Sequence, residues 1–408
     1  MTKPTRLVVF GGLIVAASIL ATERGEAHKP ITSKYTYNDD VFPIFRDRCS
    51  RCHVPGGVAP MSLMTYEEAF PWAESMRAEL VADHMPPANP EEGYGPVRRA
   101  HSLSPRDLDV ILTWATGGNP RGALDQKLPA VTLKNEWMLG TPDLALQLPA
   151  EYHLAADKME ATEEFTLAPG TSETRWIRAV DLLPGTPAIV RSAVIYVKTQ
   201  GQPTTQSTGP DRVLSRWLPG QDPDPLSAEA AFQLPAGAQL GVRIHYKKTW
   251  QYEGKALTDR STVGLYFSPA RTTQELLAIP LSTDAPVKSA PSERQIFSHT
   301  LDQDVRALAI SPDQVPANLL LQVEAVLPGG ARTPLVRWST RADWDRRYWF
   351  DPSPVLPRGT RIEVVATPED PDLYTAILGP PPAQPAAQPT VLRLALDVVP
   401  VKNGAGAQ

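Results

Sequence analysis

Five consecutive residues, Cys49 to His53 (CSRCH), carry the clearest chemical signal in the chain. Two thiols with this spacing lie about one helical turn apart, which suits thioether bonds to the two vinyl groups of a haem. The histidine that follows is then placed beneath the iron. We therefore predict one covalently attached haem c, bound through Cys49 and Cys52, with His53 as the proximal iron ligand.

Two other chemistries use a pair of cysteines with this spacing, namely a redox-active disulfide and half of a zinc site. A thioredoxin-type motif lies in an alternating strand–helix pattern, which this chain lacks. A zinc site needs two further ligands nearby, and the chain contains only two cysteines. The same count excludes a disulfide scaffold.

The second axial ligand of the iron is expected between the attachment motif and the last helix of the same domain. The candidates are four thioethers and one imidazole: Met61, Met64, Met76, Met85 and His84. Met76 falls within a helical repeat and is predicted to be core, while Met61 and Met64 follow the motif too closely to reach the opposite haem face easily. Met85 precedes two prolines that hold the backbone extended. We predict Met85 as the distal ligand, with His84 as the alternative.

Three helices are predicted around this motif. One starts at Asn38 and leads into the attachment site. A second starts at a capping box at Thr65 and is interrupted or restarted at Pro71. A third runs from the cap Ser104 to Gly117. A first and a last helix that pack together are the arrangement of a small all-α class I cytochrome c domain, which we assign to residues 28–125.

The first 27 residues read as a secretory signal peptide. Lys3 and Arg6 precede an apolar run from Leu7 to Ala21, and small residues follow near Ala27. The run is shorter than the ~20 residues that a spanning helix needs, although an uncleaved N-terminal anchor is the alternative. We therefore expect a periplasmic or otherwise exported protein, or one associated with a membrane through a partner or this segment.

Composition sets the class of the remaining chain. Proline contributes 43 of 408 residues, which disfavours long helices, and a formal charge of −5 without a basic block does not suggest a nucleic-acid partner. After residue 129, short apolar or alternating runs recur between proline–glycine turns, which favours antiparallel sandwiches. We assign residues 126–285 and 286–408 to two jelly-roll-like β-sandwiches. The clearest predicted strands are 144–148, 176–182, 188–197, 240–246, 262–267, 319–326, 361–367 and 391–399.

Residues 35–122 resemble the cytochrome c module that precedes copper type II, ascorbate-dependent monooxygenase domains in some bacterial proteins. The resemblance rests on CSRCHVPGGVAPMSLMTYEEAFPWA, HMPP and SLSPRDLDVILTWATGGNPRG. It implies Met85 of the M-P-P segment as the distal ligand.

The β-rich part resembles the two jelly-roll domains of peptidylglycine-type copper monooxygenases, through WIRAVDLLPGTPAIVRSAVIYV, LPAGAQLGVRIHY, LQVEAVLPGG and LPRGTRIEVVATPED. That resemblance implies two copper sites, but most of the family's ligands are missing here. The positions of its paired histidines hold Arg191 and Ser192, and the positions of its H-x-H motif, 313–315, hold no histidine. The histidine of the family's His-Tyr pair is retained as His245. The methionine motif has no counterpart, since no methionine follows Met159.

These observations predict an exported monohaem cytochrome that carries single electrons, with non-catalytic β-domains as a scaffold or docking surface. Its partners would be redox proteins, including a membrane or periplasmic complex in which the chain is one subunit. We expect no copper, because a lone His245 does not hold a catalytic copper ion and His153 and His299 have no ligand spacing. The alternative is a copper-dependent monooxygenase that receives electrons through its haem.

Overall fold

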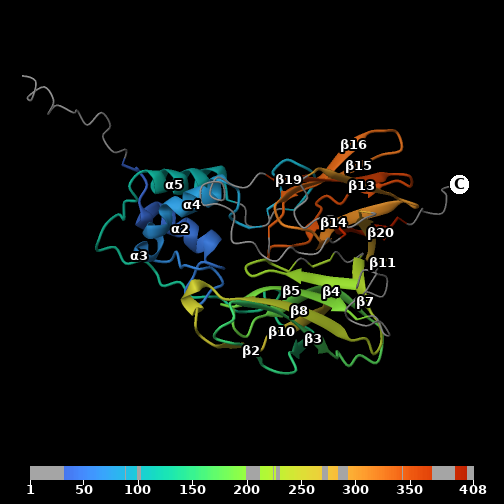
Figure 1. The fold of residues 1–408 in the computed structure, drawn as a ribbon, viewed down its shortest axis with the longest axis horizontal. Coiled ribbons are helices and arrows are strands. Elements are labelled where there is room, and N and C mark those ends of the chain that lie inside the picture. Colours follow the sequence, from blue (N-terminus) through green and yellow to red (C-terminus); the bar gives the residue numbers. More distant parts are fainter. Residues whose placement is uncertain are drawn as a thin grey trace, which may run out of the picture.

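The chain forms one helical part and two β-rich parts in the computed structural model (Figure 1). The structure describes residues 32–87, 89–98, 103–198, 212–223, 225–226, 230–268, 274–283, 293–341, 343–369 and 391–401. The predicted signal peptide, residues 1–27, lies outside these ranges. Within them, no helix is long and apolar enough to cross a membrane.

The helical part encloses a small apolar core. Its elements are two π-helical turns and a 3-10 turn that join short α-helices: η1 (Tyr37–Val41), α2 (Phe42–Ile44), η2 (Phe45–Cys49), α3 (Tyr66–Ala69), η3 (Phe70–Trp72), α4 (Ala73–Val81) and α5 (Pro105–Thr116). Helix α5 packs against α4 and η1, and Trp114 of α5 is fully buried beside Tyr37 and Phe45. The first and last helical segments therefore pack together.

Two of the three predicted helix starts are confirmed. The Thr65 hydroxyl accepts from the backbone N–H of Glu68, and the helix changes to a 3-10 turn around Pro71 before α4 begins. Ser104 caps α5, which starts at Pro105 and ends at Gly117. The predicted cap at Asn38 is wrong.

The first helix starts earlier than Asn38, at Thr36, whose hydroxyl accepts from the backbone N–H of Asp39. Asn38 is buried, and its side-chain amide donates to the carbonyl of Ala123. This distant partner accounts for the difference, because Asn38 ties the helix to the chain beyond α5 and does not cap it.

The first β-rich part is a pair of antiparallel layers over a shared core. One sheet has the order β1-β10-β4-β7-β11 and the other β3-β8-β5-β6. The bounds are β1 (Leu144–Gln147), β3 (Glu160–Leu167), β4 (Arg175–Leu183), β5 (Val190–Val197), β6 (Arg212–Trp217), β7 (Ala230–Leu234), β8 (Leu240–Lys247), β10 (Thr262–Phe267) and β11 (Gln274–Glu275), beside the small pair β2 (Tyr152–Leu154) and β9 (Leu257–Asp259). Among the described strands of this part, β11 is the one that pairs in parallel, with β7.

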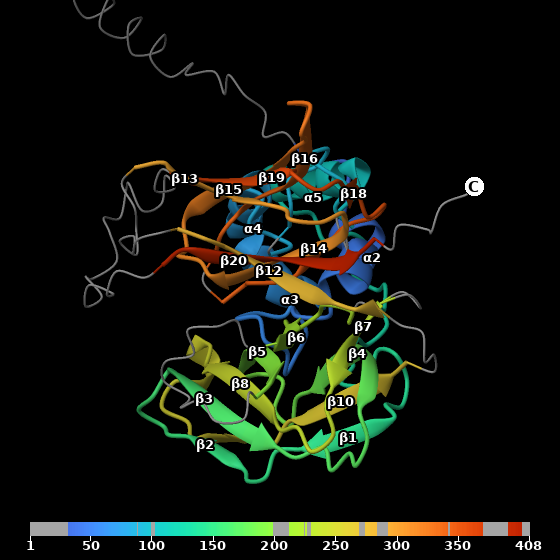
Figure 2. The ribbon, with the colours of Figure 1, turned by 90° about the vertical axis from the view of Figure 1, so that its right-hand side faces the viewer.

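The second β-rich part is built in the same way, and Figure 2 shows it above the first. Its sheets have the orders β12-β20-β14-β17 and β13-β19-β15-β16, and β18 also pairs with β14. The bounds are β12 (Leu277–Ser282), β13 (Gln295–Thr300), β14 (Val305–Gln314), β15 (Leu319–Val326), β16 (Arg332–Ser339), β17 (Tyr348–Trp349), β18 (Val355–Leu356), β19 (Arg361–Pro368) and β20 (Arg393–Pro400). The mostly β architecture is thus as predicted.

The strand pairing places the change between the two sandwiches earlier than residue 285. Strand β11 still pairs with β7 of the first sandwich, whereas β12 pairs with β20 near the end of the described chain. Residues 277–282 therefore belong to a sheet of the second sandwich. Sequence pattern alone does not show this, because a strand's composition does not identify its partner.

Candidate functional site

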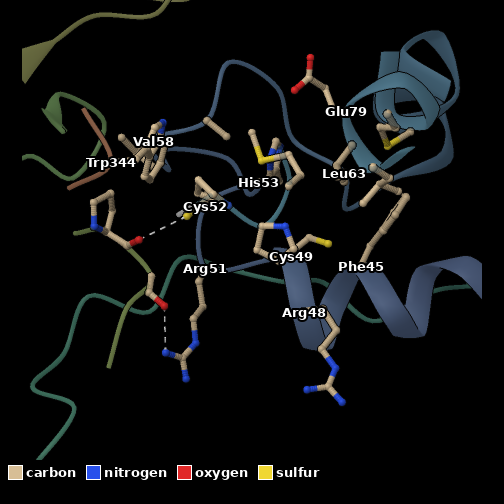
Figure 3. A pocket seen from close by; sticks show the side chains of 18 of the residues that line it. Phe45, Arg48, Cys49, Arg51, Cys52, His53, Val58, Leu63, Glu79 and Trp344 are labelled. Atoms are coloured by element: carbon tan, nitrogen blue, oxygen red, sulfur yellow. Dashed lines mark hydrogen bonds between the residues drawn. The ribbon is translucent and has the colours of Figure 1, made fainter. Parts of the chain in front are cut away.

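A cavity of about 210 Å³ lies where the helical part meets both sandwiches (Figure 3). Its lining is largely apolar, with side chains such as Phe45, Leu63 and Ile111 from the helical part. It also contains the predicted site residues Cys49, Cys52, His53 and Met85. Four residues chosen from sequence spacing therefore meet at one cavity.

The attachment motif is held in place by a helical turn at the end of η2. The backbone N–H groups of Cys52 and His53 both donate to the carbonyl of Cys49, at 3.1 and 2.8 Å. Both thiols are free and both line the cavity. Two thiols presented from one turn toward one cavity can bond to two adjacent groups on a planar ligand.

The environment of the thiols disfavours redox-disulfide chemistry. Burial raises the pKa of Cys49 to about 12 and that of Cys52 to about 11, although nearby arginines counteract the shift. A redox-active or zinc-binding cysteine is favoured by a lowered thiol pKa, because the thiolate is the reactive form. These thiols are therefore poor thiolate donors in the cavity as it stands.

His53 has the geometry of a metal-binding imidazole. Its Nδ1 lies 3.2 Å from the carbonyl oxygen of Met61, so Nδ1 carries the proton and donates to that carbonyl. Nε2 is then the nitrogen with the free lone pair. Burial lowers the pKa of His53, which favours the neutral form that a ligand must have.

The distal-ligand candidates separate in the structure. Met85 lines the cavity, whereas His84 does not and lies 3.1 Å from Glu79 through its Nδ1. Met64 is buried in the helical core and does not line the cavity, whereas Met76 of α4 packs in that core and lines the cavity as well. Met61 lines the cavity too, but its backbone carbonyl already holds His53. Three methionines, Met61, Met76 and Met85, therefore line the cavity, and the preference for Met85 stays a prediction from its position before two prolines.

The first sandwich covers the Cys52 side of the cavity with the segment that follows β6. Cys52 Sγ lies 3.7 Å from the carbonyl oxygen of Pro219, and Arg51 donates to the carbonyl oxygen of Gly220 at 3.2 Å (Figure 3). Arg51 also forms a salt bridge with Asp222. Gly220 has a φ of +75°, and a Cβ there would lie 3.0 Å from Cys52 Sγ. The left-handed backbone therefore favours glycine, and a Cβ there would also require Cys52 to shift slightly.

The second sandwich holds the chain that follows Met85. The segment 90–98 forms bridges from Pro90 to Trp338 and from Val97 to Phe350, and Tyr94 donates to Glu324 at 2.6 Å. Glu91 forms a salt bridge with Arg337. The loop that carries Met85 is therefore attached to β15 and β16.

Sequence reasoning missed the cavity residues that come from the β-rich part. Arg191, Trp344 and Arg346 line the same cavity as Cys52. No local motif marks them, because they lie far from the attachment motif in sequence and approach it only through tertiary packing.

The positions that the resemblance assigns to copper ligands hold other interactions here. Strand pairing puts Ser192 of β5 opposite His245 of β8, and His245 Nδ1 lies 3.1 Å from Asp343 Oδ1. Lys247 contacts the other carboxylate oxygen of Asp343 at 2.7 Å. Among the residues that the structure describes, no group of three or more His, Cys, Asp or Glu side chains could hold a metal ion.

No protein-family model matches the chain, and no curated protein matches it. A solved structure described as "Structure of PNGF-II in P21 space group" is 8% identical, with 68% of this chain and 63% of that chain covered and a TM-score of 0.23. The Sulfolobus Turreted Icosahedral Virus structure is 9% identical, with 68% and 100% covered and a TM-score of 0.15. The chain thus spans 63% of the first structure's length.

Proposed function

We propose that this chain is an exported, monohaem c-type cytochrome that carries single electrons, with its β-sandwiches as a non-catalytic scaffold. The observation that carries the proposal is the convergence of Cys49, Cys52, His53 and Met85 on one largely apolar cavity. A haem bound there would supply one-electron exchange at iron.

The residues present fit a covalently attached haem. Two free thiols on one helical turn match its two vinyl groups, and the imidazole is oriented through Nδ1 with Nε2 available. A thioether from Met85 would complete an axial pair that favours reduced iron more than two imidazoles do. The largely apolar walls of the cavity would provide apolar contacts for the macrocycle.

The scaffold role of the β-rich part is supported by its contacts with the Met85 loop. The contacts of Glu91 and Tyr94 with β15 and β16 fix the chain a few residues beyond Met85. A loop of this kind, held at one end only, would let the thioether leave the iron more readily. The second sandwich therefore has a use that requires no chemistry of its own.

The direct test is the iron and copper content of full-length protein matured in its own export pathway. We expect one iron per chain, haem that stays with the protein through acid–acetone extraction, and loss of haem in a Cys49→Ala, Cys52→Ala double variant. Release of all haem from the wild type on extraction would contradict the proposal.

Copper analysis decides between this function and the monooxygenase alternative. We expect less than stoichiometric copper after dialysis and no ascorbate-dependent oxygen uptake above a haem-loaded control. Tight, stoichiometric copper that is lost in His245→Ala, with turnover, would favour the monooxygenase. This measurement therefore decides whether the chain is an electron carrier or a monooxygenase.

A further inference from the structure

Two arginines from the β-rich part face the cavity without an ion-pair partner in the described chain. Arg191, at the start of β5, and Arg346, which precedes β17, both line the cavity. In each, the Nε atom is buried and has no hydrogen-bond partner among the described residues. Only 7% of Arg346 is exposed. Arg191 is partly buried, and Arg346 lies over the ring of Tyr348, 5.7 Å from its centroid. Neither guanidinium has a carboxylate partner among the described residues, although guanidinium groups removed from water are normally paired.

Asp343, the acidic residue that acts on Arg191, is already engaged elsewhere. One carboxylate oxygen of Asp343 meets His245 Nδ1 at 3.1 Å, and the other meets Lys247 Nζ at 2.7 Å. No salt bridge within 4 Å joins Arg191 to Asp343 in the described residues. The positive charge of Arg191 is therefore only partly balanced from the protein side.

Arg191 also lies close to the haem-attachment motif. Arg191 and Cys52 line the same cavity, although they lie on different parts of the chain. If Cys52 bears a thioether, a haem in this cavity would share the cavity with this guanidinium. A fixed positive charge in a site from which water is largely excluded acts strongly on a neighbouring charge change.

We infer that Arg191, assisted by Arg346, raises the reduction potential of the haem by placing buried positive charge against its Cys52 side. This inference rests on the proposed haem function. Oxidised iron carries one more positive charge than reduced iron, so nearby cations favour the reduced state. The first sandwich thereby contributes a tuning residue to a cofactor that is attached to the helical part.

The test is the reduction potential of the full-length, haem-loaded protein in Arg191→Gln, Arg191→Lys and Arg346→Gln variants. We expect Arg191→Gln to lower the equilibrium constant for haem reduction by a given mediator about tenfold, which corresponds to a decrease of about 59 mV in the reduction potential for one electron. Arg346→Gln should act in the same direction with a smaller shift. Arg191→Lys, which retains the positive charge, should have a reduction potential close to that of the wild type. Arg243→Gln on the neighbouring strand β8 is the exposed control and should leave the potential within twofold.

Ionic strength supplies a second readout. A buried charge is screened weakly, so the effect of Arg191→Gln should persist from 0.02 to 0.5 M salt. If Arg191→Gln keeps its covalent haem and has the same reduction potential as the wild type, the tuning role of Arg191 is wrong, while the proposed haem function stands. Absence of covalent haem from the wild type would instead remove the proposed function. A shift in Arg191→Lys equal to that in Arg191→Gln would show that shape, and not charge, is responsible, and would also overturn the inference.

Discussion

At the scale of single residues, the site depends on two side chains that face one cavity from separate segments. His53 is oriented by its hydrogen bond to the Met61 carbonyl, which leaves Nε2 free. Met85 reaches the same cavity from the loop beyond α4. The orientation of His53, the proposed proximal ligand, is thus fixed locally, whereas the position of Met85, the proposed distal ligand, depends on how its loop is held.

Replacement of Met85 by alanine should remove the second ligand while the covalent attachment remains. We expect the weak long-wavelength sulfur-to-iron absorption band of the oxidised protein to disappear and the reduction potential to fall, because a thioether favours reduced iron. Absorption spectroscopy and redox titration check this. Met138→Ala, at an exposed methionine, is the control. Loss of the band in Met61→Ala, with retention in Met85→Ala, would reassign the ligand.

At the scale of elements, the segment 90–98 is the connection through which the second sandwich acts on the site. Gly95 has a φ of +82°, and a Cβ there would lie 2.1 Å from the carbonyl oxygen of Leu335 on β16. Gly93 has a similar φ of +76°, yet a Cβ there would meet nothing within 4 Å. The two glycines share the backbone requirement and differ only in the close approach to β16.

This difference provides a matched pair of variants. Gly93→Ala should cost about 1 kcal/mol of stability, the usual price of a positive φ at alanine. Gly95→Ala should cost roughly 2–4 kcal/mol, because a clash with backbone forces the segment away from β16. Thermal denaturation measures both. Gly95→Ala should also weaken the sulfur-to-iron band, and equal effects of the two variants on stability and band would contradict the role of this contact.

At the scale of the whole molecule, charged groups join the two sandwiches next to the cavity. Asp343 of the second β-rich part contacts His245 and Lys247 of β8 in the first. Burial by itself raises the pKa of Asp343, but hydrogen bonds from these two side chains outweigh burial and hold the pKa well below its usual range. The ionised carboxylate therefore stabilises the contact between the sandwiches.

The sign of the pH dependence follows from that lowered pKa. The contribution of Asp343 is fully present above about pH 4, the ordinary pKa of aspartate, and is lost as the pH falls toward the folded-state pKa. Asp343→Asn should therefore cost about 1–3 kcal/mol at pH 7, and its difference from wild type should shrink between pH 5 and pH 2. Denaturant titration at each pH measures this. The exposed Asp157→Asn variant is the control, and a pH-independent difference would contradict the assignment.

The sequence by itself predicted much of the local structure. The caps at Thr65 and Ser104 are confirmed, and the eight predicted strands correspond to observed strands within a few residues. Capping and alternation are local properties, set by side chains within a few residues of each other. The turn at Cys49–His53 is local as well, because the backbone N–H groups of Cys52 and His53 donate to the carbonyl of Cys49, and the haem chemistry proposed for it rests on spacing along this turn.

Only the tertiary structure decided which distant residues complete the site. The side chain of Asn38 donates a hydrogen bond to the carbonyl of Ala123, and β12 pairs with β20 of the second sandwich. Three residues of the β-rich part, Arg191, Trp344 and Arg346, line the cavity. Each of these depends on contacts between segments that are far apart in the chain, and a residue's type does not identify a distant partner. The attachment motif is local, but its surroundings are made by packing of the helical part against both sandwiches.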